Sequence, residues 1–564
     1  MKKTVIFLVL LVMSFSGCDD LLDNSIDINL KPEQVFVNYE RIQESAVAAY
    51  TSLQSIGGYY QWAQSLKACA TDEAEETDYS SPAQQFNLGI WNQYSNPDDV
   101  YAKMYMAIRQ CNNFLENTVD YQNILVVDTI TSTGKELYVK QCQDINWYRY
   151  ELRFLRAFYY SELIKRYGGV PLITSTITEK EAMEIPRSDF KTCVKYIVDE
   201  CDSIKDHMQI DWVADGKSEF QGRATKGAAL ALKSRVLLYA ASPLNNPEND
   251  VQPWKDAAKA AKELIDMKRV GSSSASLYKL SNSYDFLFVA PNSYSDQEVI
   301  FYLRYANSNI LEAWNYPIGT PGGRSGVAPS QNLVEAYEKL TGWDPAKPYD
   351  KVDSRMQKTI VVNNSTWNNR IIESYVGGKD GIDKRNASRT GYYLKKFLSP
   401  NLDLVSSTPG RSMKVWIFFR YGEVLLNYAE ALNEAYGPTG GAADGHSMTA
   451  LDAVNLVRRR IGVNLPRLQN IDQATLKEKI KNERRVELAF EEHRAWDLRR
   501  WKDGAKLAEP IRGARITKDE TGTFSYNFNH VVENRVFEDK MYFYPLPQNE
   551  INKYPQVLNQ NPLW

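Results

Sequence analysis

Apolar residues recur at helical spacing over much of the chain, and the segments that carry this pattern come in pairs. Steps of three and four residues predict one α-helix with a stripe formed by Leu152, Leu155, Phe158, Tyr159 and Leu163. The predicted pairs occupy residues 149–169 and 186–208, 222–242 and 254–268, and 420–437 and 449–462. Paired helices of this length, with alanines where two helices must approach closely, are typical of tetratricopeptide units.

Long stretches without helical periodicity separate the pairs, chiefly residues 269–330 and 357–415. They are rich in Gly, Ser, Asn and Pro and contain short strand-like runs such as "EVIFYLRY" at 298–305. The pattern therefore predicts a mainly α-helical fold with loop-rich insertions and a few short strands. Because binding residues concentrate on loops held by a rigid scaffold, we expect the functional residues in these insertions.

The first residues read as an export signal. Two lysines precede an unbroken apolar run at 5–13, which is too short to cross a bilayer. The sequence Phe15-Ser16-Gly17-Cys18 resembles the bacterial lipobox, in which small residues precede a cysteine that becomes lipid-modified. We predict a lipoprotein signal peptide at 1–17 and a lipid anchor at Cys18; an ordinary signal peptide with an incidental cysteine is the alternative.

Composition excludes some functions and favours others. The formal net charge is −3, from 67 basic and 70 acidic residues, so the broad positive field of a nucleic-acid-binding protein is missing. Thirty-five Tyr and 12 Trp residues suit both cores and binding surfaces. Besides Cys18 the chain has five cysteines, without CxxC spacing. This predicts buried thiols and neither a disulfide framework nor a zinc site.

A run of blocks along the chain carries a family resemblance. It includes "IRQCNNFLEN", "ELRFLRAFYYSELIKRYGGVPLI", "PSQNLVEAYEKLTG", "RYGEVLLNYAEALNEAYG", "IKNERRVELAFEEHRAWDLRRW" and "MYFYPLPQNEINKYPQVLNQNPLW". In content and order these blocks resemble the SusD/RagB family of Bacteroidetes outer-membrane lipoproteins, from Cys18 to Trp564. One departure is the ending "QNPLW", where the family usually has Gly after the proline.

The resemblance implies a function and a location. It implies a glycan-binding lipoprotein on the cell surface that passes oligosaccharide to a SusC-like TonB-dependent transporter in the outer membrane, without catalysis or a cofactor. It also implies one compact globule built from an N-terminal half (18–270) and a C-terminal half (271–564). In this lineage, Asp19, Asp20 and Asp23 resemble a signal for export to the surface. Peptide or other nutrient cargo is one alternative, and a surface glycoside hydrolase, which needs two flanking carboxylates, is another.

Two charged segments could be mistaken for catalytic or metal sites. The segment "ERRVELAFEEHRAWDLRRW" holds a single histidine, whereas a helical zinc-protease motif needs two. We interpret it as a helix with the ion pairs His493–Asp497 and Glu491–Arg494, packed by Val486, Ala489, Phe490 and Trp496. The segment "ACATDEAEETDY" lacks the ligand spacing of a calcium loop, so we expect a solvated acidic loop. Because the family places ligand-facing loops near this region, Asp78 stays a candidate sugar contact.

Sugar recognition needs flat rings for the C–H faces and planar polar groups for the hydroxyls. The loop-borne candidates are Trp91 and Tyr94 in 89–99, Trp314, Tyr316 and Arg324 in 312–326, and Trp62 with Tyr59 and Tyr60 in 57–62. Trp367 and Tyr375 are further candidates. For every ring, packing in the core is the alternative, and the sequence does not indicate which of these segments meet.

Overall fold

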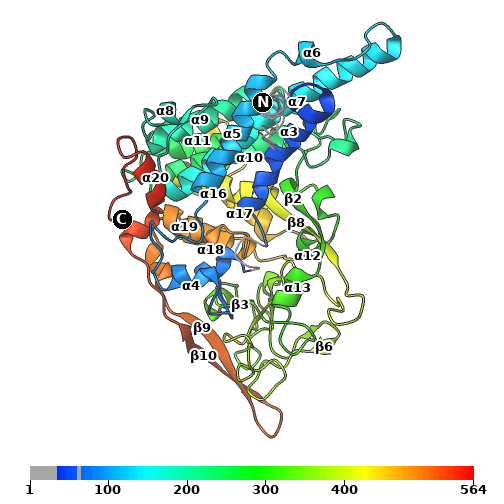
Figure 1. Ribbon diagram of the computed structural model, residues 1–564. Helices are drawn as coiled ribbons and strands as arrows, with labels where there is room; N and C mark the ends of the chain where they lie inside the picture. Colours follow the sequence, from blue (N-terminus) through cyan, green and yellow to red (C-terminus); the bar gives the residue numbers. More distant parts are fainter. Residues whose placement is uncertain (1–34, 60–64) are drawn as a thin grey trace, which may run out of the picture.

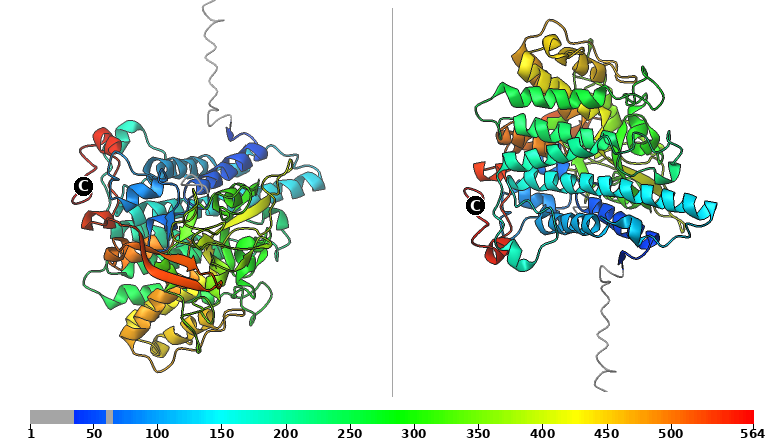
Figure 2. Two further views of the ribbon diagram at one scale, coloured as in Figure 1. Left: turned by 90° about the horizontal axis from the view of Figure 1, so that it is seen from below. Right: turned by 90° about the horizontal axis from the view of Figure 1, so that it is seen from above.

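The computed structural model describes residues 35–59 and 65–564. Its longer helices form one continuous row. The longer ones are α3 (Tyr39–Thr51), α5 (Tyr101–Asn117), α7 (Ser132–Tyr167), α9 (Phe190–Ile204), α10 (Lys226–Ala241), α11 (Val251–Ile265), α16 (Tyr421–Tyr436), α17 (Ala450–Arg458) and α18 (Gln473–Glu487). From α5 onward each packs against the next of these helices, and α16 packs against both α17 and α18. Seen from above, these helices lie side by side (Figure 2). The predicted helix pairs and the mainly α-helical class are confirmed.

Shorter helices lie mostly in the connections. They are α4 (Pro82–Asn87), α6 (Tyr121–Ile124), α8 (Glu179–Ala182), α12 (Tyr284–Val289), α13 (Ile310–Asn315), α14 (Gln331–Val334), α15 (Arg355–Thr359), α19 (Arg494–Arg500) and α20 (Gln548–Lys553). Helix α7 begins 17 residues before the predicted start, and its first turns, in which no residue from 132 to 140 is buried, project from the row (Figure 1). Gly168 ends this helix with a φ of 74°, as predicted from the sequence.

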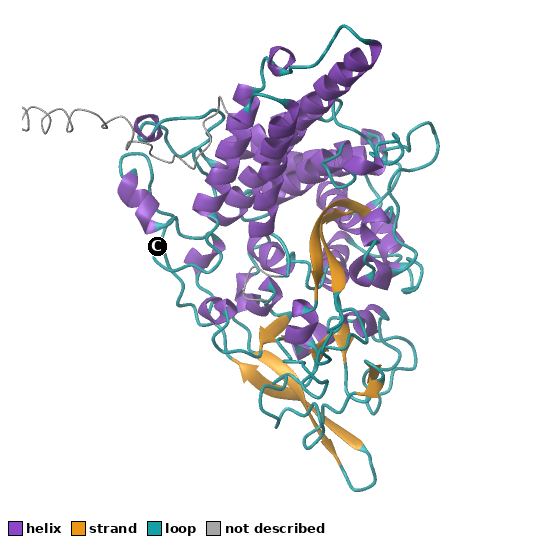
Figure 3. Cartoon of the chain, turned by 45° about the vertical axis from the view of Figure 1, so that its right-hand side comes forward, coloured by secondary structure: helices purple, strands orange, loops and turns teal. Residues whose placement is uncertain are grey.

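The strands of the described residues form five two-stranded antiparallel ladders; β2–β8 lies against the helices, and β9–β10 lies at the other end of the molecule (Figures 1 and 3). The pairs are β1 (Ala74–Glu76) with β3 (Val327–Pro329), β2 (Val299–Ser308) with β8 (Ser412–Arg420), β4 (Ile360–Val361) with β7 (Tyr393–Leu394), β5 (Thr366–Trp367) with β6 (Arg370–Ile371), and β9 (Ile511–Lys518) with β10 (Phe524–Glu533). The run at 298–305 that the pattern predicted as a strand falls almost wholly within β2. The loops between these short ladders make up most of this end.

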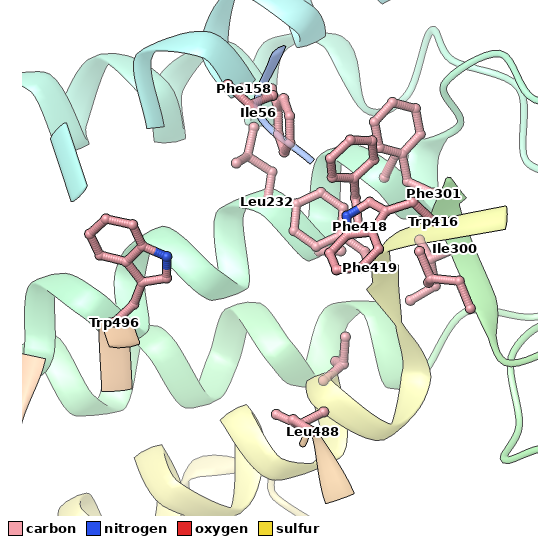
Figure 4. Close-up of a cluster of buried hydrophobic side chains, with 14 of the residues drawn as sticks. Ile56, Phe158, Leu232, Ile300, Phe301, Trp416, Phe418, Phe419, Leu488 and Trp496 are labelled. Carbon is pink, nitrogen blue, oxygen red and sulfur yellow. The ribbon is translucent and has the colours of Figure 1, made fainter. Parts of the chain in front are cut away.

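An aromatic cluster joins the helical row to the β2–β8 ladder (Figure 4). Phe158 of α7 meets Phe301 of β2 at a ring-centroid distance of 5.9 Å, and Phe418 and Phe419 of β8 at 5.5 and 5.7 Å. The buried core is continuous through α10, α11 and α16, so residues on both sides of position 270 share it. Among the described residues, no helix is both long and apolar enough to cross a bilayer.

The segment at 480–501 is two helices rather than the single predicted helix. Helix α18 ends at Glu487 and α19 begins at Arg494, and two residues between them, Phe490 and Glu492, have a φ of 65°. The predicted pairs His493–Asp497 and Glu491–Arg494 are wrong: Asp497 binds Arg484 and Arg500 of the same segment, and Glu491 and Arg494 bind partners outside it. Glu491 binds Arg420 of β8 and Lys396, and Arg494 binds Asp72. Packing by the four predicted residues is confirmed, since all are buried: Val486, Ala489, Phe490 and Trp496.

Candidate functional site

The β1–β3 ladder brings together two loops that lie some 250 residues apart in the sequence. Beyond the ladder, the Thr77 amide donates to the Gly326 carbonyl at 2.9 Å, and the Thr77 hydroxyl donates to the Ser325 carbonyl at 2.9 Å. Asp78 and Tyr79 therefore leave β1 beside the loop at 314–326. We call residues 77–80, residues 314–326 and Arg389 the loop face.

The loop at 314–326 is closed on itself by backbone hydrogen bonds. The Gly326 amide donates to the Trp314 carbonyl at 2.6 Å, and the Ser325 amide donates to the Tyr316 carbonyl at 2.9 Å. At Gly319 the amide donates to Asp380 Oδ1 at 3.0 Å, and a Cβ there would come within 2.6 Å of that oxygen. This contact requires glycine at position 319 and fixes the loop to the segment that carries Asp380.

Each of the two rings on the loop face lies against a guanidinium group. The Arg324 guanidinium is 4.8 Å from the centre of the half-buried Trp314 ring, and Arg324 itself is exposed. The Tyr79 ring is 68% exposed, and the Arg389 guanidinium lies 3.9 Å from its centre. Arg389 donates to the Glu75 carboxylate and, at 3.0 Å, to the Glu76 carbonyl. Planar rings beside fixed donors are the combination that carbohydrate faces and hydroxyls require.

Asp78, Trp314 and Arg324, three of the residues proposed from sequence, thus lie on one face. Asp78 is exposed, and its Oδ1 accepts from the Ser80 amide and hydroxyl, both at 2.8 Å. Tyr316 requires a correction, because its side chain is fully buried. Its hydroxyl donates to the Ser399 carbonyl and accepts from the Leu402 amide, so the ring anchors the loop and has no face for a ligand.

The predicted pair Trp91 and Tyr94 is split by the fold. Trp91 is 2% exposed and packs against Tyr544 and Trp564, with ring-centroid distances of 5.0 and 4.8 Å, so its assignment as a stacking residue is corrected to packing. Tyr94 is 77% exposed and borders a separate polar cavity of about 240 Å³ beside Gln548. Tyr59 is also fully buried. Trp62, Tyr60 and Cys18 lie outside the described residues.

Sequence reasoning missed Tyr79 and Arg389. Among the described residues, Tyr94 and Tyr79 are the two most exposed aromatic side chains. Tyr79 stands next to the proposed Asp78, so adjacency was an available signal. Arg389 gave none, because its position beside Tyr79 depends on contacts with β1 that lie more than 300 residues away in sequence.

The acidic segment before Asp78 is buried rather than solvated, which overturns the prediction for it. Asp72 binds Arg494 through two contacts of 2.8 Å and Arg485 at 2.7 Å. Burial raises the pKa of Glu75 and of Glu76 to about 7, although Arg389 opposes the shift at Glu75. These carboxyls lie beneath the loop face and stabilise its base. In the described part of the chain, no group of three or more acidic, histidine or cysteine side chains is arranged to hold a metal ion.

We expect Glu73→Gln to stabilise the protein at pH 8 and to have little effect at pH 5. Burial and the adjacent Asp72 charge raise the pKa of Glu73 to about 8. The pKa of this carboxyl is 4.5 in the unfolded chain, so between pH 4.5 and pH 8 the group is ionised in the unfolded state and protonated in the folded one. The wild type therefore loses about 1.4 kcal/mol of unfolding free energy per pH unit in this range. Gln removes this loss. Urea unfolding at both pH values measures the effect, and an equal change at pH 5 and pH 8 contradicts it.

Comparison with known proteins decides the family. A sequence model of the SusD family matches residues 297–564, and a second, described as starch-binding and associating with the outer membrane, matches residues 20–238. Together the two models span most of the chain. The chain belongs to the SusD/RagB family. The family resemblance noted in the sequence is thereby confirmed.

Similarity to individual SusD-like proteins extends over nearly the whole chain. A SusD-like protein from Bacteroides fragilis has the same fold, with 27% identity and a TM-score of 0.74 over 94% of this chain and 98% of its own. A SusD-like carbohydrate-binding protein from the same species is 23% identical, with a TM-score of 0.72 over 93% of this chain and 100% of its own. SusD-like protein P25 of Formosa agariphila is 23% identical over 88% of this chain and 90% of its own length.

Proposed function

We propose that this SusD/RagB protein binds glycans at the loop face and delivers them to a SusC-like TonB-dependent transporter at the outer membrane. The observation that carries the binding step is the joining of the loops at 77–80 and 314–326. This contact brings the segment with Asp78 and Tyr79 next to the loop that carries Trp314 and the exposed Arg324. Tyr94, beside its own polar cavity, is a further candidate contact.

The geometry favours binding without catalysis. A glycoside hydrolase needs two carboxyl groups that reach either side of the scissile bond. Glu73, Glu75 and Glu76, whose pKa values burial raises to about 8, 7 and 7, are at most 3% exposed. Asp78 is the exposed carboxylate of the loop face itself. One accessible carboxylate beside two rings suits hydrogen bonding to a sugar hydroxyl.

A binding screen tests the proposal. We expect purified protein to bind at least one member of a panel of maltohexaose, cellohexaose, xylohexaose and mannohexaose by calorimetry, and to leave it intact by chromatography after prolonged incubation. A matched set of random-sequence hexapeptides serves as the competing cargo class. Binding of peptides alone would favour the alternative of peptide cargo, and the appearance of shorter sugars would establish a hydrolase.

Anchoring through Cys18 forms the second part of the proposal. We expect Cys18→Ala to move the protein from the membrane fraction to the soluble fraction, because the acyl chains that hold it would be missing. Replacement of Asp19 and Asp20 by Ala is expected to lower surface exposure and to leave the anchor intact. Protease treatment of intact cells measures exposure. Equal removal of the wild type and the Asp19/Asp20 variant would mean that the two acids act only as a polar spacer.

A further inference from the structure

A second cavity of about 610 Å³ lies between the β9–β10 hairpin and the segment from 346 to 367. Its walls include the turn at 346–350, strands β4 and β5 with the turn between them, Lys395, and two aromatic residues of β10. None of these residues belongs to the loop face. A volume of this size is in the range of small-molecule binding sites in proteins, roughly 300–1,000 Å³.

Aromatic rings form one side of this cavity. Phe524, Tyr526 and Phe528 alternate along β10, so they share one face of the strand. The Tyr526 ring stacks on Phe528 at 5.6 Å and meets the edge of Tyr349 at 5.7 Å. Tyr375, one of the candidates proposed from sequence, supports Phe524 from the side at 5.6 Å. Phe524 and Tyr526 are half-buried, so the hairpin holds them without covering them.

The facing wall of the cavity is polar. Asn363 is 4% exposed; its Oδ1 accepts from the Ser374 amide at 3.1 Å, and its side chain faces the Tyr526 hydroxyl, which ties this wall to β10. Trp367, another candidate from sequence, is 8% exposed, and its Nε1 has no hydrogen-bond partner. Lys395 Nζ lies 5.3 Å from the centre of the Trp367 ring and donates to the Gln357 carbonyl at 2.7 Å. The exposed residues Asn364 and Thr366 add accessible polar groups to this wall beside Lys395.

Aromatic faces on one side and donors on the other fit a ligand with flat C–H faces and many acceptor oxygens. We propose that this cavity is a second carbohydrate site, in which one face of a pyranose ring packs on Tyr526 and its oxygens accept from the facing wall. The site goes beyond the proposed function, which needs only the loop face. Its β5–β6 hairpin is tied to that face, because Arg370 of β6 donates to the Thr320 hydroxyl at 3.1 Å and binds Asp380.

Calorimetric stoichiometry tests this second site, with whichever hexasaccharide of the panel binds most tightly as the probe. We expect two equivalents per wild-type chain. Tyr526→Ala should weaken the cavity site at least about tenfold, which leaves one measurable equivalent. Tyr526→Phe keeps the ring and should retain two. Tyr138→Ala, on the projecting part of α7, is the matched control and should also retain two.

The outcomes separate the two sites. A wild type that binds one equivalent, lost in Trp314→Ala and unchanged in Tyr526→Ala, overturns the cavity site and leaves the loop face intact. Binding that is lost in Tyr526→Ala and unchanged in Trp314→Ala supports the cavity and overturns the loop face. Absence of binding for every hexasaccharide overturns both. Hydrogen exchange of residues 360–367 gives a second readout, since glycan at the cavity should slow it in wild type and not in Tyr526→Ala.

Discussion

Glu487→Gln is expected to lower the free energy of unfolding by about 3–5 kcal/mol, the usual cost of breaking a buried ion pair from one side. Glu487 is fully buried at the end of α18, and its carboxylate binds three guanidinium groups. It accepts from Arg355 at 2.8 Å, from Arg420 at 2.9 Å and from Arg460. Gln would leave these cations with one negative charge fewer in a region that water does not reach.

The pH dependence of this effect has a defined sign. Despite its burial, the surrounding guanidiniums hold the pKa of Glu487 well below its ordinary value of 4.5. A carboxyl group whose pKa is lower in the folded than in the unfolded protein stabilises the folded state at pH values above its unfolded pKa. This stabilisation is lost as the pH falls below about 4.5. The difference between wild type and Glu487→Gln should therefore be full at pH 7 and smaller at pH 3.

The matched control is Glu478→Gln on the same helix. The Glu478 side chain is 65% exposed, and its carboxylate lies 3.5 Å from Lys481, so we expect a change of no more than about 1 kcal/mol. Urea unfolding of the three proteins at pH 7 measures both values. Equal stability of the two variants would contradict the conclusion that the buried ion pairs of Glu487 hold α18 to β8.

Local periodicity was enough to predict the helical scaffold. The apolar stripe in 149–169 and the nearly all-apolar segment 222–242 are patterns that a few consecutive helical turns of sequence reveal. Helices α7 and α10 lie at these segments. The projecting start of α7 was not predicted, because its few apolar residues, Leu137 and Val139 among them, are exposed and form no buried stripe. The loop pair Trp314 and Arg324 was also accessible from sequence, since the two lie close together in one glycine-rich segment.

The failures share a physical cause, which is contact between distant parts of the chain. Trp91 and Tyr94 stand three residues apart in one irregular segment, where no periodicity separates an inner from an outer face. Trp91 is buried by Tyr544 and Trp564, more than 450 residues later, whereas Tyr94 stays exposed. The acids from Asp72 to Glu76 looked solvated because their partners, including Arg494, follow more than 300 residues later.

The second large effect is expected for the double variant Tyr79→Ala/Trp314→Ala, which should reduce glycan affinity at the loop face by roughly a hundredfold. Each ring offers a planar apolar surface beside a guanidinium group, and loss of one such contact is worth about tenfold. The two rings do not stack on each other, so their effects should add. Both lie at the surface of locked loops, so a matching melting temperature would show that the fold is intact.

The most direct test of the account is one calorimetric comparison, in which the glycan selected by the panel is titrated into wild type, Tyr79→Ala/Trp314→Ala and the distant control Tyr138→Ala. The account predicts that wild type and Tyr138→Ala bind at the loop face with equal affinity. It predicts that the double variant loses this site and keeps at most the cavity beside β10. Unchanged affinity and stoichiometry in the double variant would contradict the assignment of the loop face as the glycan-binding site.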